Sequence, residues 1–197
     1  MHKAIALAKE IDREHEFDTP NVAVYFGEPK VKAADPYFKG KGPERVGCHF
    51  CGGCMTGCRH NSKNTLDKNY LYLAQNLGAE ILAEHEVFNV IENKNKDGYI
   101  VSAKKSTSIL KKKVYFKTKG VIFSGGVMGT IKLLLKLKKQ SLPLISNQLG
   151  EDIRTNNESL ISVTNLDGTK NLSKGVAIGS ILHTDEDSHL EICRYSS

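Results

Sequence analysis

The sequence predicts a mixed fold of the α/β class, α+β overall, in which a βαβ unit is combined with antiparallel sheet. Three patterns carry this prediction: a strand, a glycine turn and a helix over 120–137, a hairpin over 87–104, and short strands beyond 160. The 197 residues suit one domain or two small ones, and a hydrophobic content of 40% is ordinary for a globular chain.

The N-terminal part is predicted to hold one helix, one strand and a long loop. Apolar residues recur at helical spacing over 3–16, which predicts an amphipathic helix. The β-rich run 21–26 lies between Pro20 and Gly27 and predicts a strand. Three prolines and three glycines in 28–47 indicate a surface loop.

A second helix and a β region follow. Apolar residues share one helical face over 65–77, with Asn64 as the expected N-cap and Gly78 as the stop signal. Short strands are expected at 81–82 and 87–91. The turn 95–98 then leads into a strand at 99–104, which is the pattern of a hairpin. Strands at 114–117 and 121–123 extend this region.

The segment 120–137 has the order of a phosphate-binding corner. A buried-looking strand ends at Ser124, the glycines Gly125, Gly126 and Gly129 follow, and an apolar helix covers 131–137. Glycines let the backbone approach a ligand, and a helix N-terminus offers unpaired N–H groups. The pattern is shorter than the full G-x-G-x-x-G, so a tight turn that binds nothing is the alternative. Further strands are expected near 160–166, 176–182 and 189–195.

Four of the five cysteines lie in one run, with the spacing C-x2-C-x2-C-x3-C. This spacing is that of a ferredoxin iron–sulfur site, and zinc or the absence of any metal are the alternatives. Arg59 replaces the proline of the ferredoxin pattern, and there is no second set of cysteines. His49 and His60 flank the run and are further candidate ligands, although such histidines are more often ordinary loop residues. The cysteines in question are Cys48, Cys51, Cys54 and Cys58.

Charge and hydropathy indicate which partners and which cellular compartment to expect for the protein. The formal charge of +6 is spread along the chain, and its densest run, 111–113, is expected to be a solvated turn between strands, so no nucleic acid is expected as partner. No stretch has the roughly 20 apolar residues of a membrane span. Charged residues follow the N-terminal apolar residues too soon for the apolar core of a signal peptide, so we expect a cytoplasmic protein with reduced cysteines.

Taken in order, the motifs resemble the glucose–methanol–choline (GMC) oxidoreductases, and more closely their bacterial, cholesterol-oxidase-like branch. The resemblance rests on the runs 51–58, 63–71, 78–81, 121–130 and 154–160, and it covers about residues 20–197. It implies an FAD-dependent enzyme that oxidises the CH–OH group of an alcohol or sterol, with a further electron acceptor as a partner.

The resemblance also implies domains and cofactor contacts. Residues 1–47 would form part of the substrate domain and a connecting loop, 48–157 part of the FAD-binding domain, and 158–197 a further part of the substrate domain. The implied FAD-binding residues lie in the hairpin, in the glycine corner and after the cysteine run: Val87, Ser124, Gly125, Gly126, Gly129 and Asn61.

Two family motifs are missing from these 197 residues: the N-terminal G-x-G-x-x-G and the late histidine pair that supplies the base. His183 and His189 have no matching motif, so no catalytic residue is assigned. We therefore expect a central fragment of a larger enzyme, inactive alone and unable to hold FAD stoichiometrically. The alternative function is an iron–sulfur electron-transfer module built on the cysteine run, and a zinc-stabilised binding module is a third.

Overall fold

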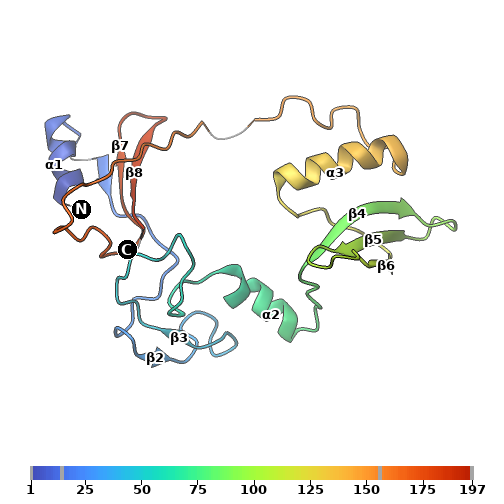
Figure 1. Ribbon diagram of the computed structural model, residues 1–197, viewed down its shortest axis with the longest axis horizontal. Coiled ribbons are helices and arrows are strands. Elements are labelled where there is room, and N and C mark those ends of the chain that lie inside the picture. The colour runs from blue at the N-terminus through green and yellow to red at the C-terminus, as the bar shows by residue number, and fades with distance from the viewer. Residues whose placement is uncertain (1, 14–15, 155–156, 196–197) are drawn as a thin grey trace. The chain divides into compact units, whose positions relative to one another are not determined.

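The computed structural model describes residues 2–13, 16–154 and 157–195 (Figure 1). The chain divides into two compact units, one formed by residues 1–80 together with 163–197, and the other by 81–162. Each unit has its own three-stranded sheet. None of the helices in the described part of the chain has the length and apolarity needed to cross a bilayer.

The first unit contains a three-stranded antiparallel sheet built from both ends of the chain. Strand β7 (Ile178–His183) lies between β1 (Phe17–Asp18) and β8 (His189–Cys193). Helix α1 (His2–Glu10) contacts β1 and β7, and its Ala8 is fully buried.

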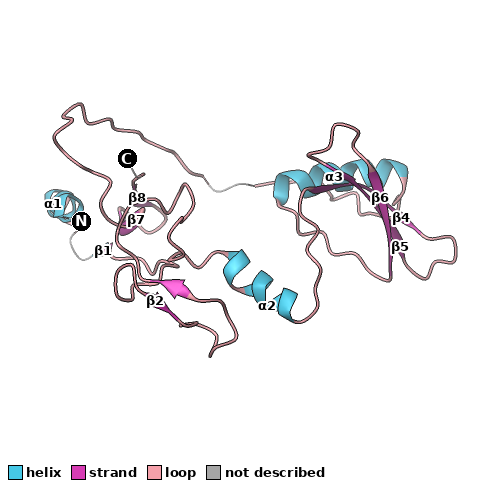
Figure 2. Cartoon of the chain, turned by 60° about the horizontal axis from the view of Figure 1, so that its bottom comes forward, coloured by secondary structure: helices cyan, strands magenta, loops and turns pink. Residues whose placement is uncertain are grey.

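The rest of the first unit is largely loop (Figure 2). Strands β2 (Lys32–Ala33) and β3 (Arg45–Val46) form a short antiparallel pair. The cysteine run follows β3 directly. A 3-10 turn, η2 (Leu66–Lys68), and helix α2 (Tyr70–Asn76) complete the unit.

The second unit is an antiparallel meander with one helix beside it. Strands β4 (His85–Glu92), β5 (Tyr99–Lys105) and β6 (Lys113–Thr118) pair in sequence order. Helix α3 (Val127–Gln140) is anchored to β4, because Lys136 Nζ donates to the Phe88 carbonyl over 2.9 Å and Ser141 Oγ donates to the Val90 carbonyl over 2.7 Å. The buried apolar side chains of this unit are Val90, Ala103 and Leu137.

Several elements confirm the sequence predictions. The hairpin over 87–104 forms as β4 and β5, the strand at 114–117 forms as β6, and the exposed lysine run lies before and at the start of β6. The helix expected at 131–137 is longer and starts directly after Gly126. The late strands form as β7 and β8. Each of these elements either has a strong local signal, such as a glycine turn, or pairs with a strand that is its neighbour along the chain.

Four predicted strands were wrong: 21–26, 81–82, 121–123 and 160–166 form no strand. Among the described residues, only Val24 of the first run makes a bridge, to Lys63, and Ile122 in the third is 91% exposed. A strand needs a neighbour to accept and donate its backbone hydrogen bonds. These runs have the composition of strands. Among the described residues, the first run makes isolated backbone hydrogen bonds to residues 48 and 62–64, and none of the four runs forms a regular ladder. All ladders between named strands in the described residues are antiparallel, and the parallel βαβ arrangement stays a prediction.

Two helix predictions need correction. The helix expected over 3–16 ends at Glu10, because the backbone turns left-handed at Asp12 (φ 56°). Residues 14–15 of this predicted helix lie outside the described residues. So do residues 155–156, which belong to the run 154–160 that resembles the GMC family. The helix expected over 65–77 is broken at Asn69. Asn69, instead of Asn64, caps α2 by accepting the Tyr70 N–H.

Candidate functional site

The cysteine run forms a loop whose two ends are held on the segment 23–25. The Cys48 N–H donates to the Tyr25 carbonyl over 3.0 Å, and the Tyr25 N–H donates to the Ser62 carbonyl over 2.8 Å. The Asn64 N–H donates to the Ala23 carbonyl over 2.8 Å. These hydrogen bonds bring residues 48 and 62–64 to either side of one extended segment, so the intervening loop must double back on itself.

The doubled loop encloses a small cavity into which the cysteines converge. All four cysteines of the run line it, together with both flanking histidines: Cys48, Cys51, Cys54, Cys58, His49 and His60. None of the five cysteines of the chain is in a disulfide. The loop is further fixed by the Gly175 N–H, which donates to the Phe50 carbonyl over 2.8 Å.

The pKa values of two of the thiols, Cys48 and Cys58, are shifted in opposite directions. Burial, and to a lesser degree the neighbouring thiols, raise the pKa of Cys48. Burial acts in the same direction on Cys58, but the backbone N–H groups of Lys63, Ser62 and His60 together outweigh it and lower the pKa of that thiol. Cys58 therefore holds the thiolate form more readily than Cys48.

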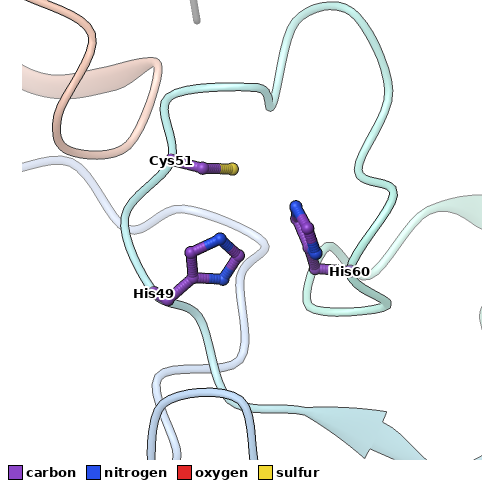
Figure 3. Close-up of side chains that lie close together, drawn as sticks. All are labelled: His49, Cys51 and His60. Carbon is purple, nitrogen blue, oxygen red and sulfur yellow. The ribbon is translucent and has the colours of Figure 1, made fainter.

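One side of the cavity brings three potential metal ligands together. A ring nitrogen of His49, the Sγ of Cys51 and a ring nitrogen of His60 lie within 4.8 Å of one another (Figure 3). The two imidazole rings are 4.2 Å apart between centroids and nearly perpendicular, at 84°. Burial, with the charges of His60 and Lys30, lowers the pKa of His49 and favours its neutral form.

Asn61, predicted to contact the cofactor, lies at the end of the same loop. Its backbone is left-handed (φ 59°), its side-chain Nδ2 donates to the Glu44 carbonyl over 2.9 Å, and its carbonyl accepts from the Val46 N–H over 3.2 Å. Asn61 thus supports β3 structurally. It belongs to the first unit, whereas the other predicted cofactor residues belong to the second.

The glycine corner of the second unit is an open backbone turn before α3. Gly126 is the N-cap residue with φ 88°, in the region that favours glycine, and the Thr130 N–H donates to its carbonyl over 2.9 Å. A Cβ placed on Gly126 or Gly129 would meet no atom within 4 Å. Ser124 and Gly125 are exposed as well. The first turn of α3 therefore presents its backbone N–H groups to open space.

Val87, the remaining predicted residue, lies on β4 opposite Ala103. The register of the β4–β5 ladder shifts between Val87 and Asn89, which is a bulge, and bulges leave backbone groups outside the regular ladder. Helix α3 is anchored at the same place through Phe88 and Lys136. Strand β4 therefore both contains Val87 and anchors α3, the helix that follows the glycine corner.

Sequence reasoning named His49 and His60 as candidate ligands, but it did not predict that they lie together beside Cys51. The histidines are eleven residues apart, and only the folding back of the loop makes them neighbours. The available signal was the H-x-C pattern at the start of the run and the histidine two residues after its end. Sequence reasoning also gave no role to Arg45, whose side chain is completely buried.

The glycine turn that opens α3 is of the kind that lets backbone N–H groups approach the diphosphate of a dinucleotide. The family model described as GMC oxidoreductase matches residues 43–148, more than half of the chain, and the chain therefore belongs to the GMC oxidoreductase family. The matched region contains the cysteine loop, the meander and the glycine corner.

Individual relatives agree with this assignment. A protein named cholesterol oxidase from Acinetobacter baumannii is 46% identical over 193 residues, which is 93% of this chain and 35% of the relative. A cholesterol oxidase from Mycobacterium tuberculosis is 39% identical over 183 residues, or 88% of this chain and 32% of the relative. The chain thus spans about a third of the length of these relatives. No solved structure gives a significant match.

Proposed function

We propose that this chain is the central part of an FAD-dependent oxidoreductase that oxidises the CH–OH group of an alcohol, with a sterol as the favoured substrate class. Membership of the GMC family supports the reaction type, and the two relatives named cholesterol oxidase support the sterol. The comparisons give no support to an iron–sulfur electron-transfer module, so we do not propose it.

The observation that carries the proposal is the open glycine corner. A dinucleotide diphosphate needs backbone N–H groups and close approach, and the space that a Cβ would take at Gly126 and at Gly129 is open. The exposed N-terminus of the fourteen-residue α3 adds the positive end of a helix dipole. The residues present therefore fit the diphosphate, with Ser124 and Gly125 beside it.

The remaining contacts follow the family resemblance. We propose that the backbone of Val87, at its bulge in β4, contacts the adenine, and that Asn61 lies on the side of the flavin. Residues 48–157 would then contribute to the FAD-binding domain, and residues 1–47 and 158–197 to the substrate domain. When bound, the flavin would supply the hydride acceptor of the reaction. The role of this chain is to bind and orient the cofactor, and none of its residues is proposed as the base.

The proposal is tested on the longest natural protein that contains these residues. We expect a purified protein with about one FAD per chain, whose flavin absorbance is bleached when a 3β-hydroxysterol is added without oxygen. Short primary alcohols and sugars, added in parallel, test the substrate class. Oxygen consumption and an artificial acceptor dye then tell an oxidase from a dehydrogenase.

Gly129→Val tests the role of the corner, with Gly120→Val as its matched control. Both glycines are exposed and have no neighbour near the Cβ position. We expect the Gly129 variant to lose FAD and the Gly120 variant to keep it, with circular dichroism unchanged in both. A protein that is folded but binds no FAD, or that binds FAD equally well in both variants, would contradict the proposal.

A further inference from the structure

We propose that His49, Cys51 and His60 bind a zinc-type divalent metal ion, with a second thiolate of the same cavity completing a four-coordinate site. This site is independent of the flavin chemistry proposed above. It differs from the four-cysteine site that the sequence pattern suggests, because two of its ligands are histidines.

The geometry of the three side chains suits one ion. Their ligand atoms lie within 4.8 Å of one another and point toward a common space (Figure 3). Zinc lies about 2.0–2.1 Å from nitrogen and about 2.3 Å from sulfur, so ligands around a tetrahedral ion are roughly 3.5 Å apart. The three side chains therefore need only small rotations to reach this geometry.

The chemistry of the lining selects the class of ion. Two imidazoles and thiols are ligands for zinc and related transition metals, whereas magnesium and calcium prefer oxygen ligands. The cavity contains no carboxylate among its lining residues, and three further thiols are available for the fourth position: Cys48, Cys54 and Cys58.

The position of the site in the fold suggests that the ion has a structural role. His49 and Cys51 lie on the first arm of the doubled loop, and His60 lies on the second arm. An ion bound by all three would cross-link the arms, in addition to the backbone hydrogen bonds at Tyr25. The loop has little helix or strand to hold its two arms together. A metal cross-link would supply this support, which would explain why so many potential ligand residues occur in the loop.

Metal analysis of the purified full chain tests the inference. We expect about one zinc ion per chain. After removal by a chelator, the protein should rebind added Zn²⁺ or Co²⁺, and bound Co²⁺ should show both thiolate-to-cobalt charge transfer and the intense visible bands of a tetrahedral site. Cys51→Ser should weaken the charge-transfer band, and His49→Gln or His60→Gln should weaken Co²⁺ binding at least about tenfold, equivalent to about 1.4 kcal/mol.

Two variants outside the cavity serve as controls. His85→Gln removes a histidine of the second unit, and Cys193→Ser removes an exposed thiol of β8. Both should bind Co²⁺ as the original chain does. Circular dichroism of each metal-free variant, compared with the metal-free original, separates loss of a ligand from loss of the fold.

Three results would overturn the inference. One is a folded chain that binds neither zinc nor cobalt. Another is Co²⁺ affinity that is unchanged by both histidine substitutions. The third is iron with acid-labile sulfide in place of zinc, lost on substitution of any of the four cysteines but not of the histidines, since that would assign the cavity to an iron–sulfur cluster.

Discussion

Arg45 Nη2 donates to Asn64 Oδ1 over 2.8 Å and thereby joins the two ends of the cysteine loop. The same nitrogen donates to the Lys68 carbonyl over 2.5 Å, and the ring of Tyr37 lies 5.7 Å from the guanidinium carbon. The side chain is completely buried, and none of the ion pairs found among the described residues involves it. Its charge is therefore stabilised by neutral acceptors.

Asn64→Ala should destabilise the first unit by about 1–3 kcal/mol, because it removes one acceptor of a buried charged donor. The measurement is urea unfolding followed by circular dichroism, which suits a chain without tryptophan. Arg59→Ala, an exposed position in the same loop, is the control and should change the free energy of unfolding by no more than about 0.5 kcal/mol. Equal effects of the two substitutions would contradict the structural role of Arg45.

Leu137 is the central apolar side chain of the second unit, with an exposed fraction of 0%. Leu137→Ala should lower the free energy of unfolding of this unit by about 2–5 kcal/mol, since it leaves a cavity between α3 and the meander. Leu144→Ala is chemically the same change at a position that is 98% exposed, and it should have almost no effect. Similar unfolding midpoints for both variants would show that α3 does not pack as described.

Two glycines of the corner should respond to alanine with opposite signs. Gly126 has φ 88°, so Gly126→Ala should cost about 1–2 kcal/mol. Gly129 lies inside α3 with open space around it, so Gly129→Ala should raise the stability of the helix by about 0.5–1 kcal/mol. The two variants are compared by thermal unfolding of the same chain. A stabilised Gly126 variant would mean that the helix does not begin at this turn.

The sequence predicts best those elements whose partners are close along the chain. The turn 95–98 sets the β4–β5 hairpin, and Gly126 sets the start of α3, so both follow from local chemistry. The run 121–123 looks like a strand by composition, but it forms no ladder among the described residues. Pairing is a property of two segments, and the composition of one segment does not supply its neighbour.

The arrangement of the candidate metal ligands also depends on contacts between distant segments, which the sequence does not predict. The cysteine spacing is visible in the sequence, and it suggested a four-thiol site. The approach of His49 to His60 depends instead on hydrogen bonds between the loop ends and residues 23–25, which lie more than twenty residues earlier. No periodicity in the run itself encodes that contact. The role of Arg45 was missed for the same reason, since Asn64 is nineteen residues away.

The thiols of Cys58 and Cys48 should titrate in different pH ranges in the metal-free chain. Backbone N–H groups outweigh burial and lower the pKa of Cys58, whereas burial raises the pKa of Cys48. Because the thiolate is the nucleophile, the alkylation rate of each cysteine should rise as the pH rises through its own pKa. Mass spectrometry of peptides after timed iodoacetamide treatment measures both rates. The midpoint for Cys58 should lie below the midpoint for Cys48, and the comparison of midpoints is independent of how accessible each thiol is. The reverse order would contradict the hydrogen bonding described for the loop.

Asp35 organises the loop before β3 by accepting backbone N–H groups from Tyr37, Phe38, Gly40 and Gly42 at 2.9–3.0 Å. Burial alone would raise the pKa of this carboxyl, but the four donors together lower it. A carboxyl with a lowered pKa in the folded state contributes stability above its unfolded pKa of about 3.9 and loses that contribution as the pH falls through the folded pKa.

An NMR titration of the Phe38, Gly40 and Gly42 amide protons tests this arrangement. All three resonances should shift together with one midpoint below about 3.9, because they report the same carboxylate. Asp35→Asn keeps the shape of the side chain but removes its charge, so these amides should lose the titration and exchange faster with solvent. Asp187→Asn, in the turn between β7 and β8, is the matched control and should leave the three resonances unchanged. A midpoint at or above the unfolded value, or three different midpoints, would show that the carboxylate does not hold the loop in this form.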